Sequence, residues 1–314
     1  MLRSTFLYLS NQPRLQKFVS RNRFARRMAR RFVAGETLAE ALDAVAALNK
    51  QGITASLDLL GESVTREEEA RASAREYLAI LDRIHERKLD ANVSVKLTAM
   101  GLDIAEDLCV ANMQEILARA RQYGSFVRID MEASDYTEKT LKLFEHRLYP
   151  SYPENVGIVL QSYLYRTADD TERAVTLRCR VRLCKGAYAE PATVAYPEKK
   201  DVDANYVRCM QRLMSAGNYP GLATHDEKII ETAKRFAAEQ SIPVERYEFQ
   251  MLYGVRRDLQ EGLVSEGYRM RVYVPFGTEW YPYLMRRLAE RPANIVFIVG
   301  NVLREMFGGR KRLR

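Results

Sequence analysis

The sequence predicts a (β/α)8 barrel of the TIM type, preceded by an N-terminal helical arm. Three observations predict this fold. The chain has 314 residues, which suits one large α/β domain. From residue 52 onward, eight short β-type runs alternate with segments whose apolar spacing is helical. The chain contains neither G-x-G-x-x-G nor the phosphate-loop pattern G-x-x-x-x-G-K-S/T, which disfavours an open nucleotide-binding sheet, the main competing fold.

The predicted strands are short, as expected for a barrel. They cover residues 52–59, 92–97, 126–132, 157–162, 180–185, 221–225, 247–252 and 271–277. Helical spacing is clear over residues 35–52, 65–90 and 226–240. No internal repeat, low-complexity tract or Pro/Gly/Ser linker interrupts this pattern, which favours a single domain. We expect a basic helical arm over 1–50, the barrel over 51–307 and a basic tail over 308–314.

The net charge of +8 is concentrated at the two ends of the chain. Residues 1–35 contain eight Arg, one Lys and no acidic residue, and the last five residues contain four more basic groups. The remainder has more acidic than basic side chains, which argues against a nucleic-acid-binding core. The basic ends fit contact with an anionic membrane surface. The N-terminal stretch also fits a transit peptide, although a basic helix packed on the domain is the preferred interpretation.

Membrane-spanning and metal-binding functions find no support in the sequence. No apolar run approaches the ~20 residues that a spanning helix needs. The four cysteines form no C-x-x-C pair and share no metal-ligand spacing with the three histidines. We therefore expect no metal site, and a reducing cytoplasm, with peripheral contact to the inner membrane face as an option.

Polar residues end almost every predicted strand. These residues are Asp58, Lys96, Asp130, Gln161, Arg182, His225, Gln250 and Tyr273. Side chains alternate along a strand, so the aliphatic set faces the helices and the polar set faces the barrel interior. A lone buried charge is costly, whereas a group of charges at the C-terminal mouth is typical of an active site in this fold. The strand ends therefore predict a site.

The segment after the last strand adds positive charge to this predicted site. A helix is expected to begin near Thr278, with Glu279 in its first turn. Tyr283, Arg286 and Arg287 share one face of it, because they are spaced i, i+3 and i+4. Together with Lys96, the two arginines would suit a small anion such as a carboxylate.

At this point the motifs resemble the proline dehydrogenase family. The stretches "RVRLCKGAY", "GLATHD", "FQMLYGV" and "RVYVPFGTEWYPYLMRRLAERPAN" carry the resemblance, which runs from about "RRFVAGETL" to Phe307. It implies a monofunctional bacterial enzyme that oxidises L-proline to 1-pyrroline-5-carboxylate with FAD and passes electrons to a membrane quinone. A separate pyrroline-5-carboxylate dehydrogenase is the downstream partner that it implies.

The resemblance also implies roles for individual residues. Catalytic roles would fall to Asp130, Arg182 and Tyr273, and substrate binding to Lys96, Leu252, Tyr273, Arg286 and Arg287. Cofactor binding would fall to Met131, Gln161, Arg182, Lys185, Gly186, Ala187, Thr224 and His225. Glu62 would form a gate with Arg286 or Arg287.

Two other functions compete with this interpretation. Another barrel flavoprotein, similar to methylenetetrahydrofolate reductase, would not need the arginine pair beside Lys96. A non-enzymatic basic-armed adaptor for membranes or RNA would bind no chromophore. Purely structural roles are the alternative for single residues: Tyr273 as a core aromatic, and His225 as a support for the helix that follows it.

Overall fold

The computed structural model describes residues 29–290, and only the backbone of residues 288–290. These residues belong to two compact units. Residues 31–278 form one unit, and residues 29–30 and 279–290 belong to the other. The predicted arm before residue 29, the end of the predicted barrel and the basic tail lie outside the described residues.

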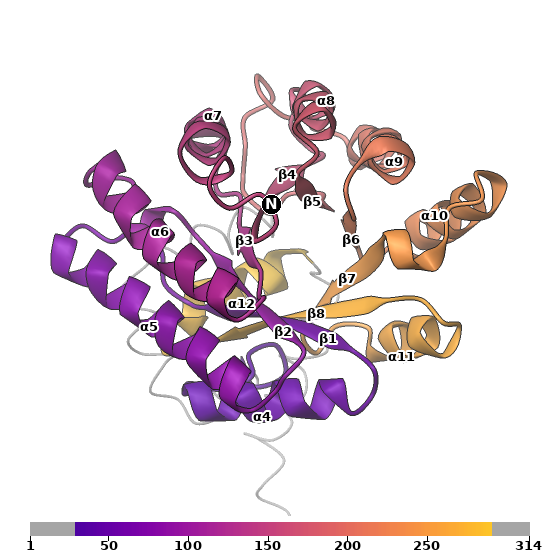
Figure 1. The fold of residues 1–314 in the computed structure, drawn as a ribbon. Helices are drawn as coiled ribbons and strands as arrows, with labels where there is room; N and C mark the ends of the chain where they lie inside the picture. The colour runs from indigo at the N-terminus through magenta and orange to yellow at the C-terminus, as the bar shows by residue number, and fades with distance from the viewer. Residues whose placement is uncertain (1–28, 291–314) are drawn as a thin grey trace, which may run out of the picture. The chain divides into compact units, whose positions relative to one another are not determined.

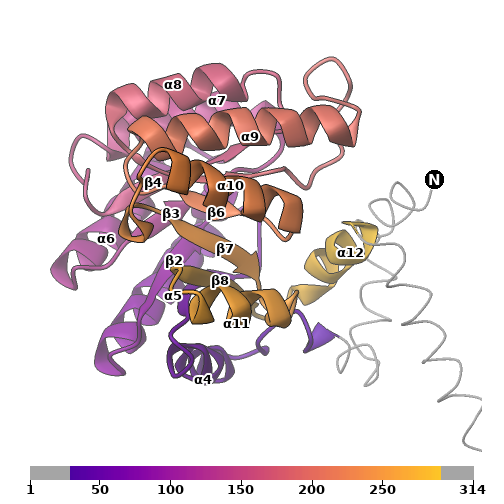
Figure 2. The same ribbon diagram turned by 90° about the vertical axis from the view of Figure 1, so that its right-hand side faces the viewer.

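Eight parallel strands close into a barrel in sequential order, and helices surround it (Figures 1 and 2). The strands are β1 Thr54–Leu59, β2 Ala91–Val95, β3 Val127–Ile129, β4 Val156–Gln161, β5 Arg180–Cys184, β6 Gly221–Ala223, β7 Glu248–Leu252 and β8 Met270–Phe276. Strand β8 pairs with β1 from Thr54↔Arg271 to Leu59↔Phe276, and this register closes the cylinder. The predicted (β/α)8 barrel is confirmed.

The helices of the barrel unit are one before β1 and one after each strand from β1 to β7. They are α4 Leu38–Asn49, α5 Glu67–Glu86, α6 Glu106–Gln122, α7 Ser134–Leu143, α8 Thr167–Leu177, α9 Lys199–Ala216, α10 Glu227–Glu239 and α11 Arg257–Ser265. Short helical turns are η1 Thr98–Met100, η2 Phe144–Leu148 and η3 Val244–Arg246. Helix α12 Trp280–Glu290 belongs to the second unit. It begins after Glu279, so this acid precedes the first turn rather than lying in it as predicted.

Local sequence signals explain where elements begin and how they attach. Thr37 and Glu40 form a capping box at the start of α4, which satisfies backbone N–H groups that a helix leaves without partners. On α5, the Tyr77 hydroxyl donates to the carbonyl oxygen of Ser94 at 2.8 Å and accepts from the backbone N–H of Leu59 at 3.3 Å. One buried phenol thus ties α5 to the ends of β1 and β2.

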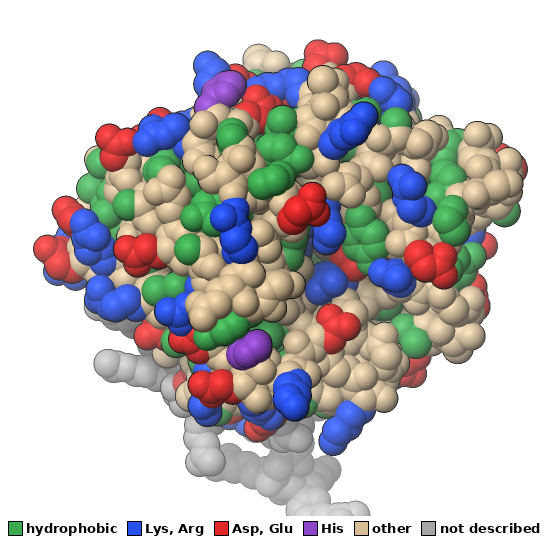
Figure 3. All heavy atoms as spheres, in the orientation of Figure 1, with side chains coloured by type: hydrophobic (Ala, Val, Ile, Leu, Met, Phe, Trp, Pro, Cys, Tyr) green, Lys and Arg blue, Asp and Glu red, His purple; other side chains and the backbone are tan. Residues whose placement is uncertain are grey.

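The two faces of each strand separate as the alternation predicts. Val93, Val95 and Leu97 are fully buried in the aliphatic layer between strands and helices. Several strands end earlier than predicted, so Lys96, Asp130 and His225 lie just beyond β2, β3 and β6. On the face seen in Figure 3, charged side chains of both signs are intermixed over the helices.

Gly157 of β4 leaves the space that a buried arginine occupies. A Cβ atom here would lie 2.4 Å from the Arg180 carbonyl oxygen and 2.7 Å from both Arg128 Nη1 and Phe126 Cζ. Arg128 Nη1 donates to the carbonyl oxygens of Ile158 at 3.0 Å and Arg180 at 2.7 Å. Burial and the neighbouring Arg182 lower the pKa of Arg128 to about 9. The guanidinium is therefore still charged at neutral pH.

Gly157→Ala should destabilise the protein by about 1–3 kcal/mol or more, because two of the three close atoms belong to backbone or a packed ring. Urea unfolding of both variants and the wild type would measure this. Gly262→Ala on α11 is the matched control, since a Cβ there meets nothing within 4 Å. That change should be neutral or stabilise by up to about 1 kcal/mol through helix propensity. Equal midpoints for the two variants would contradict the packing argument.

Candidate active site

Arg182 lies at the centre of a polar cluster inside the barrel. Its Nη1 donates to Asp130 Oδ1 at 2.8 Å and its Nε to Gln250 Oε1 at 2.6 Å. Its Nη2 donates to the hydroxyls of Ser94 at 3.1 Å and Ser56 at 3.4 Å. Strands β5 and β2 are not neighbours in the sheet, so the contact with Ser94 crosses the barrel interior. The inward direction predicted for these side chains is therefore confirmed.

Asp130 joins Arg182 to Tyr273. The Tyr273 hydroxyl donates to Asp130 Oδ2 at 2.7 Å, and the Arg182 guanidinium lies 5.2 Å from the centre of the Tyr273 ring. Burial, with the charge of Asp130 next, raises the pKa of Tyr273 well above its ordinary value. The phenol therefore stays neutral and acts as a hydrogen-bond donor.

Lys96 forms a second charged pair in the same cluster. Its Nζ lies 2.9 Å from Asp58 Oδ1, and both side chains are buried. Burial alone would lower the pKa of Lys96, but Asp58, Asp130 and Glu62 raise it well above its ordinary value. Glu62, the predicted gate residue, therefore lies within electrostatic range of Lys96. The second carboxylate oxygen of Asp58, Oδ2, is buried and has no hydrogen-bond partner among the described residues.

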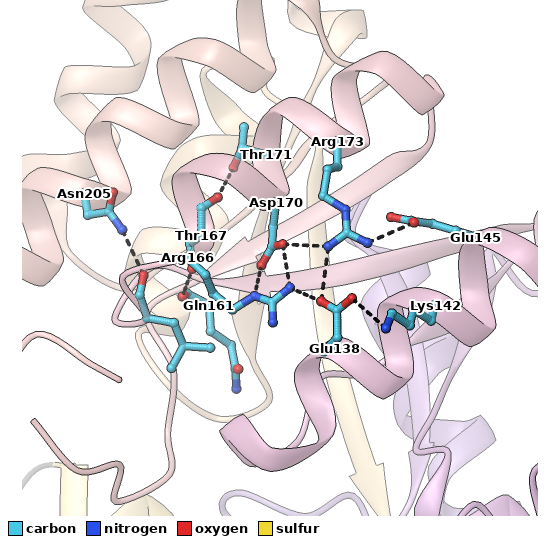
Figure 4. A network of polar contacts seen from close by, with 11 residues as sticks. Glu138, Lys142, Glu145, Gln161, Arg166, Thr167, Asp170, Thr171, Arg173 and Asn205 are labelled. Atoms are coloured by element: carbon cyan, nitrogen blue, oxygen red, sulfur yellow. Dashed lines mark hydrogen bonds and ion pairs between the residues drawn. The ribbon is translucent and has the colours of Figure 1, made fainter. Parts of the chain in front are cut away.

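The end of β4 presents Gln161, and its surroundings fix its backbone. In Figure 4, Arg166 and Arg173 link the carboxylates of Glu138, Glu145 and Asp170, and so fasten α8 to the α7–η2 segment. Thr167 at the start of α8 donates to the carbonyl oxygen of Gln161. The Gln161 side-chain amide lies apart from this network in the figure, and its Nε2 donates to the carbonyl oxygen of Glu132 at 3.2 Å.

The segment Lys185–Ala187 after β5 is attached to the segment after β4. Tyr163 N donates to the Lys185 carbonyl oxygen at 2.9 Å, Tyr196 N donates to the Tyr163 carbonyl oxygen at 2.7 Å, and Leu164 and Ala195 form an antiparallel bridge. Gly186 has φ +105, and a Cβ there would lie 2.5 Å from the Tyr163 ring. Only glycine fits this turn against the ring.

Lys185, Thr224 and His225 all have partners within the protein. Lys185 Nζ lies 2.6 Å from a carboxylate oxygen of Asp203 and 3.0 Å from one of Asp226. Thr224 Oγ1 accepts from Asp226 N at 3.1 Å, and Asp226 caps α10. His225 Nε2 accepts from Leu252 N at 3.0 Å, so it connects the segment after β6 to the end of β7. Cofactor roles for these residues remain predictions.

Arg286 and Arg287, the two arginines predicted to bind a small anion, lie on α12, which belongs to the second compact unit. The Arg287 guanidinium lies 5.2 Å from the centre of the Tyr283 ring, so these residues share a helix face as predicted. Convergence of Arg286 and Arg287 with Lys96 remains a prediction.

Sequence reasoning gave no site role to several residues of the cluster. Asp58 and Gln250 were recognised only as polar strand ends, although Asp58 pairs with Lys96 and Gln250 with Arg182. Glu248 and Glu132 were not singled out. Glu132 accepts from both the backbone and the hydroxyl of Thr98. The two-residue spacing of Glu248 and Gln250, which places both inside the barrel, was an available signal.

The barrel interior offers hydrogen-bonding groups that match a flavin, whose ring system carries both donors and acceptors. The buried Oε1 of Gln161 has no hydrogen-bond partner among residues 29–290, so it can accept from a ligand. The four hydrogen bonds of Arg182 use four of its five N–H groups and leave one N–H on Nη1. A buried acceptor and a cationic donor of this kind suit the groups at the edge of a flavin ring.

The fold and this interior cluster define a barrel with an enzyme-type polar site built from its strand ends. The family model for proline dehydrogenase matches residues 41–299. The chain therefore belongs to the proline dehydrogenase family.

Individual relatives agree with this assignment. Proline dehydrogenase 1 of Bacillus subtilis (strain 168) is 44% identical over 306 residues, which cover 97% of this chain and 100% of the relative. Proline dehydrogenase of Deinococcus radiodurans is 42% identical over 307 residues, covering 97% and 98%. The crystal structure of proline utilization A from Bdellovibrio bacteriovorus, inactivated by N-propargylglycine, has a TM-score of 0.81 and 28% identity. The match covers 91% of this chain and 34% of that longer chain.

Within residues 29–290, no helix is long and apolar enough to cross a membrane.

Lys96→Met should lower the free energy of unfolding by about 3–5 kcal/mol at pH 7, because Asp58 would stay buried without its partner. The double variant Lys96→Met/Asp58→Asn should recover part of this loss, since no orphaned charge remains. Urea unfolding of the single and double variants would measure both effects.

The same pair predicts a pH dependence. The pKa of Lys96 is higher in the folded protein than in the unfolded chain, where it is about 10.4. Its contribution is therefore complete below about pH 10 and is lost as the pH rises through the folded-state pKa. The gap in stability between wild type and Lys96→Met should not shrink from pH 7 to pH 9, because Lys96 stays charged over this range and burial raises the pKa of Asp58. A gap that closes by pH 9 would mean that Lys96 is neutral in the fold.

Proposed function

We propose that this chain oxidises L-proline to 1-pyrroline-5-carboxylate with bound FAD, and that a membrane quinone then receives the electrons. Family membership supports the reaction class. Three features of the barrel carry the assignment to this site: the N–H that Arg182 retains, the buried Gln161 amide oxygen that has no partner among the described residues, and the Lys96–Asp58 pair.

When bound, FAD would supply the hydride acceptor for the carbon beside the ring nitrogen of proline. Arg182 and Gln161 would hold the isoalloxazine ring, with Met131 beside it. Lys185, Gly186, Ala187, Thr224 and His225 would contact the rest of the cofactor. A fixed cation at the ring favours its reduced, anionic form, because the electrostatic attraction is stronger for that state.

Substrate binding would fall to Lys96, Arg286 and Arg287 for the carboxylate and to Tyr273 and Leu252 for the pyrrolidine ring. Positive charge around the bound substrate disfavours the protonated amine. This matters because the amine lone pair must stabilise the iminium that forms. Asp130 limits the positive charge and orients both Arg182 and Tyr273. Glu62 would close over the substrate by pairing with Arg286 or Arg287.

The cellular setting is part of the proposal. The product would pass to a separate pyrroline-5-carboxylate dehydrogenase. The basic N-terminal segment, which lies outside the described residues, would contact the inner face of the cell membrane, where the quinone resides.

The visible absorbance of the purified protein tests the proposed function. We expect flavin bands that L-proline bleaches under anaerobic conditions and that a short-chain quinone restores. A reductase that acts on folates would keep its flavin oxidised when proline is added. A colourless protein that FAD does not reconstitute would favour the adaptor function instead.

Arg286→Ala and Arg287→Ala should each raise the KM for proline about 10- to 100-fold, because each removes a charge-assisted hydrogen bond worth about 1.5–3 kcal/mol. Both variants should retain flavin. Arg212→Ala is the matched control, since Arg212 pairs with Glu172 on the barrel surface. Loss of flavin with an unchanged KM would show that the arginines serve the cofactor rather than the substrate.

A further inference from the structure

We propose that Gln250, held in place by Glu248, is a positioning residue that fixes Arg182 in its working geometry. This inference rests on the proposed function, because it gives Arg182 a partner whose effect on catalysis passes through Arg182. Gln250 is buried on β7 and has no other evident task in the proposed reaction.

The geometry of the contact is specific. Gln250 Oε1 accepts the single N–H of Arg182 Nε at 2.6 Å. The rotation of a guanidinium about its side-chain axis is constrained when Nε and the terminal nitrogens are bound at different places. Gln250 binds Nε, whereas Asp130 and the two serines bind the terminal nitrogens. Gln250 therefore helps to fix the plane of the guanidinium and, with it, the direction of the remaining N–H of Nη1.

Glu248 determines which way the Gln250 amide is oriented. Gln250 Nε2 donates to Glu248 Oε1 at 2.6 Å. If the amide were flipped, its NH2 group would face the Arg182 N–H and its oxygen would face a carboxylate, and both contacts would be repulsive. Glu248 is itself anchored, because Arg271 Nε donates to Oε1 at 2.7 Å and the Tyr219 hydroxyl donates to Oε2 at 3.1 Å.

Glu248 is ionised under working conditions. Burial alone would raise its pKa, but Arg271, with which it is paired, lowers it below the ordinary value. The chain of hydrogen bonds therefore has a single polarity, from Arg182 through Gln250 to the Glu248 carboxylate.

The barrel provides a gap for this arrangement. Strand β6 lies between β5 and β7, and Gly221 is in register with Arg182 on one side and Glu248 on the other. A Cβ at Gly221 would lie 2.3 Å from Gln250 Nε2 and 2.8 Å from its Cδ. Because β6 carries no side chain here, Arg182 and Gln250 can meet across an intervening strand.

Gln250→Met keeps the side-chain length and removes both hydrogen bonds, so it is the primary test. We expect the rate constant of flavin reduction at saturating proline to fall about tenfold, as loss of one hydrogen bond to a charged group predicts. The KM for proline should change less than about twofold, because the substitution acts on Arg182 rather than on the residues proposed to bind the proline carboxylate. The reduction potential of the bound flavin should shift to a more negative value in spectroelectrochemical titration.

A double-mutant cycle separates positioning from a general structural role. In an Arg182→Lys background, Gln250→Met should change neither the potential nor the reduction rate further, since its effect passes through Arg182. Gly221→Ala should reproduce the shift without removing the amide, which covers the case in which Gln250→Met does not fold. Asn112→Leu on α6 removes a buried amide that bonds to the Met100 carbonyl oxygen, and it should leave the flavin potential unchanged.

The outcomes distinguish this inference from the function on which it rests. If Arg182→Lys alters the flavin and Gln250→Met does not, or if their effects add, Gln250 is not a positioning residue and the proposed function stands. If Arg182→Lys leaves potential and rate unchanged, both the inference and the role of Arg182 fail. A protein that binds no flavin overturns both proposals.

Discussion

The charge of Arg182 in the barrel interior is the constraint to which the rest of the site is fitted. A buried guanidinium is tolerated only when its donors are satisfied and its charge is balanced. Here the acceptors come from four different strands or strand ends: Ser56, Ser94, Asp130 and Gln250. Each of these acceptors faces inward because the strands alternate, and they meet because the barrel is closed. The complete set of acceptors around Arg182 therefore requires the closed sheet.

The site balances its buried charges and still keeps hydrogen-bonding groups that a ligand can use. Lys96 is matched by Asp58, and Arg182 by Asp130, so the folded interior contains no isolated charge at these positions. Each pair still has unused hydrogen-bonding capacity, since Asp58 Oδ2 lacks a partner among the described residues and Arg182 retains one N–H. Such a surface suits a ligand that can both donate and accept hydrogen bonds.

Sequence reasoning was most reliable where one period dominates. Eight short runs alternating with helices predicted the closed barrel, and the polar residues at strand ends predicted its interior cluster. The sequence pattern did not predict which polar side chains bond to one another, because partners such as Arg182 and Gln250 lie 68 residues apart and meet across β6. Partners of this kind depend on barrel register, which period alone does not contain. The arginines of α12 show a further limit, since a shared helix face follows from their spacing but their distance from Lys96 does not.

The contacts between the segments after β4 and β5 restrict insertions and deletions in both segments. The bridge of Leu164 with Ala195 and the bonds of Tyr163 to Lys185 and Tyr196 bind the two segments as though they were one piece. Insertions or deletions in either segment would shift the other, together with the Gly186 turn that packs on Tyr163. The lengths of these two segments should therefore change together among related sequences. An engineered exchange of loops should transfer both segments as a pair.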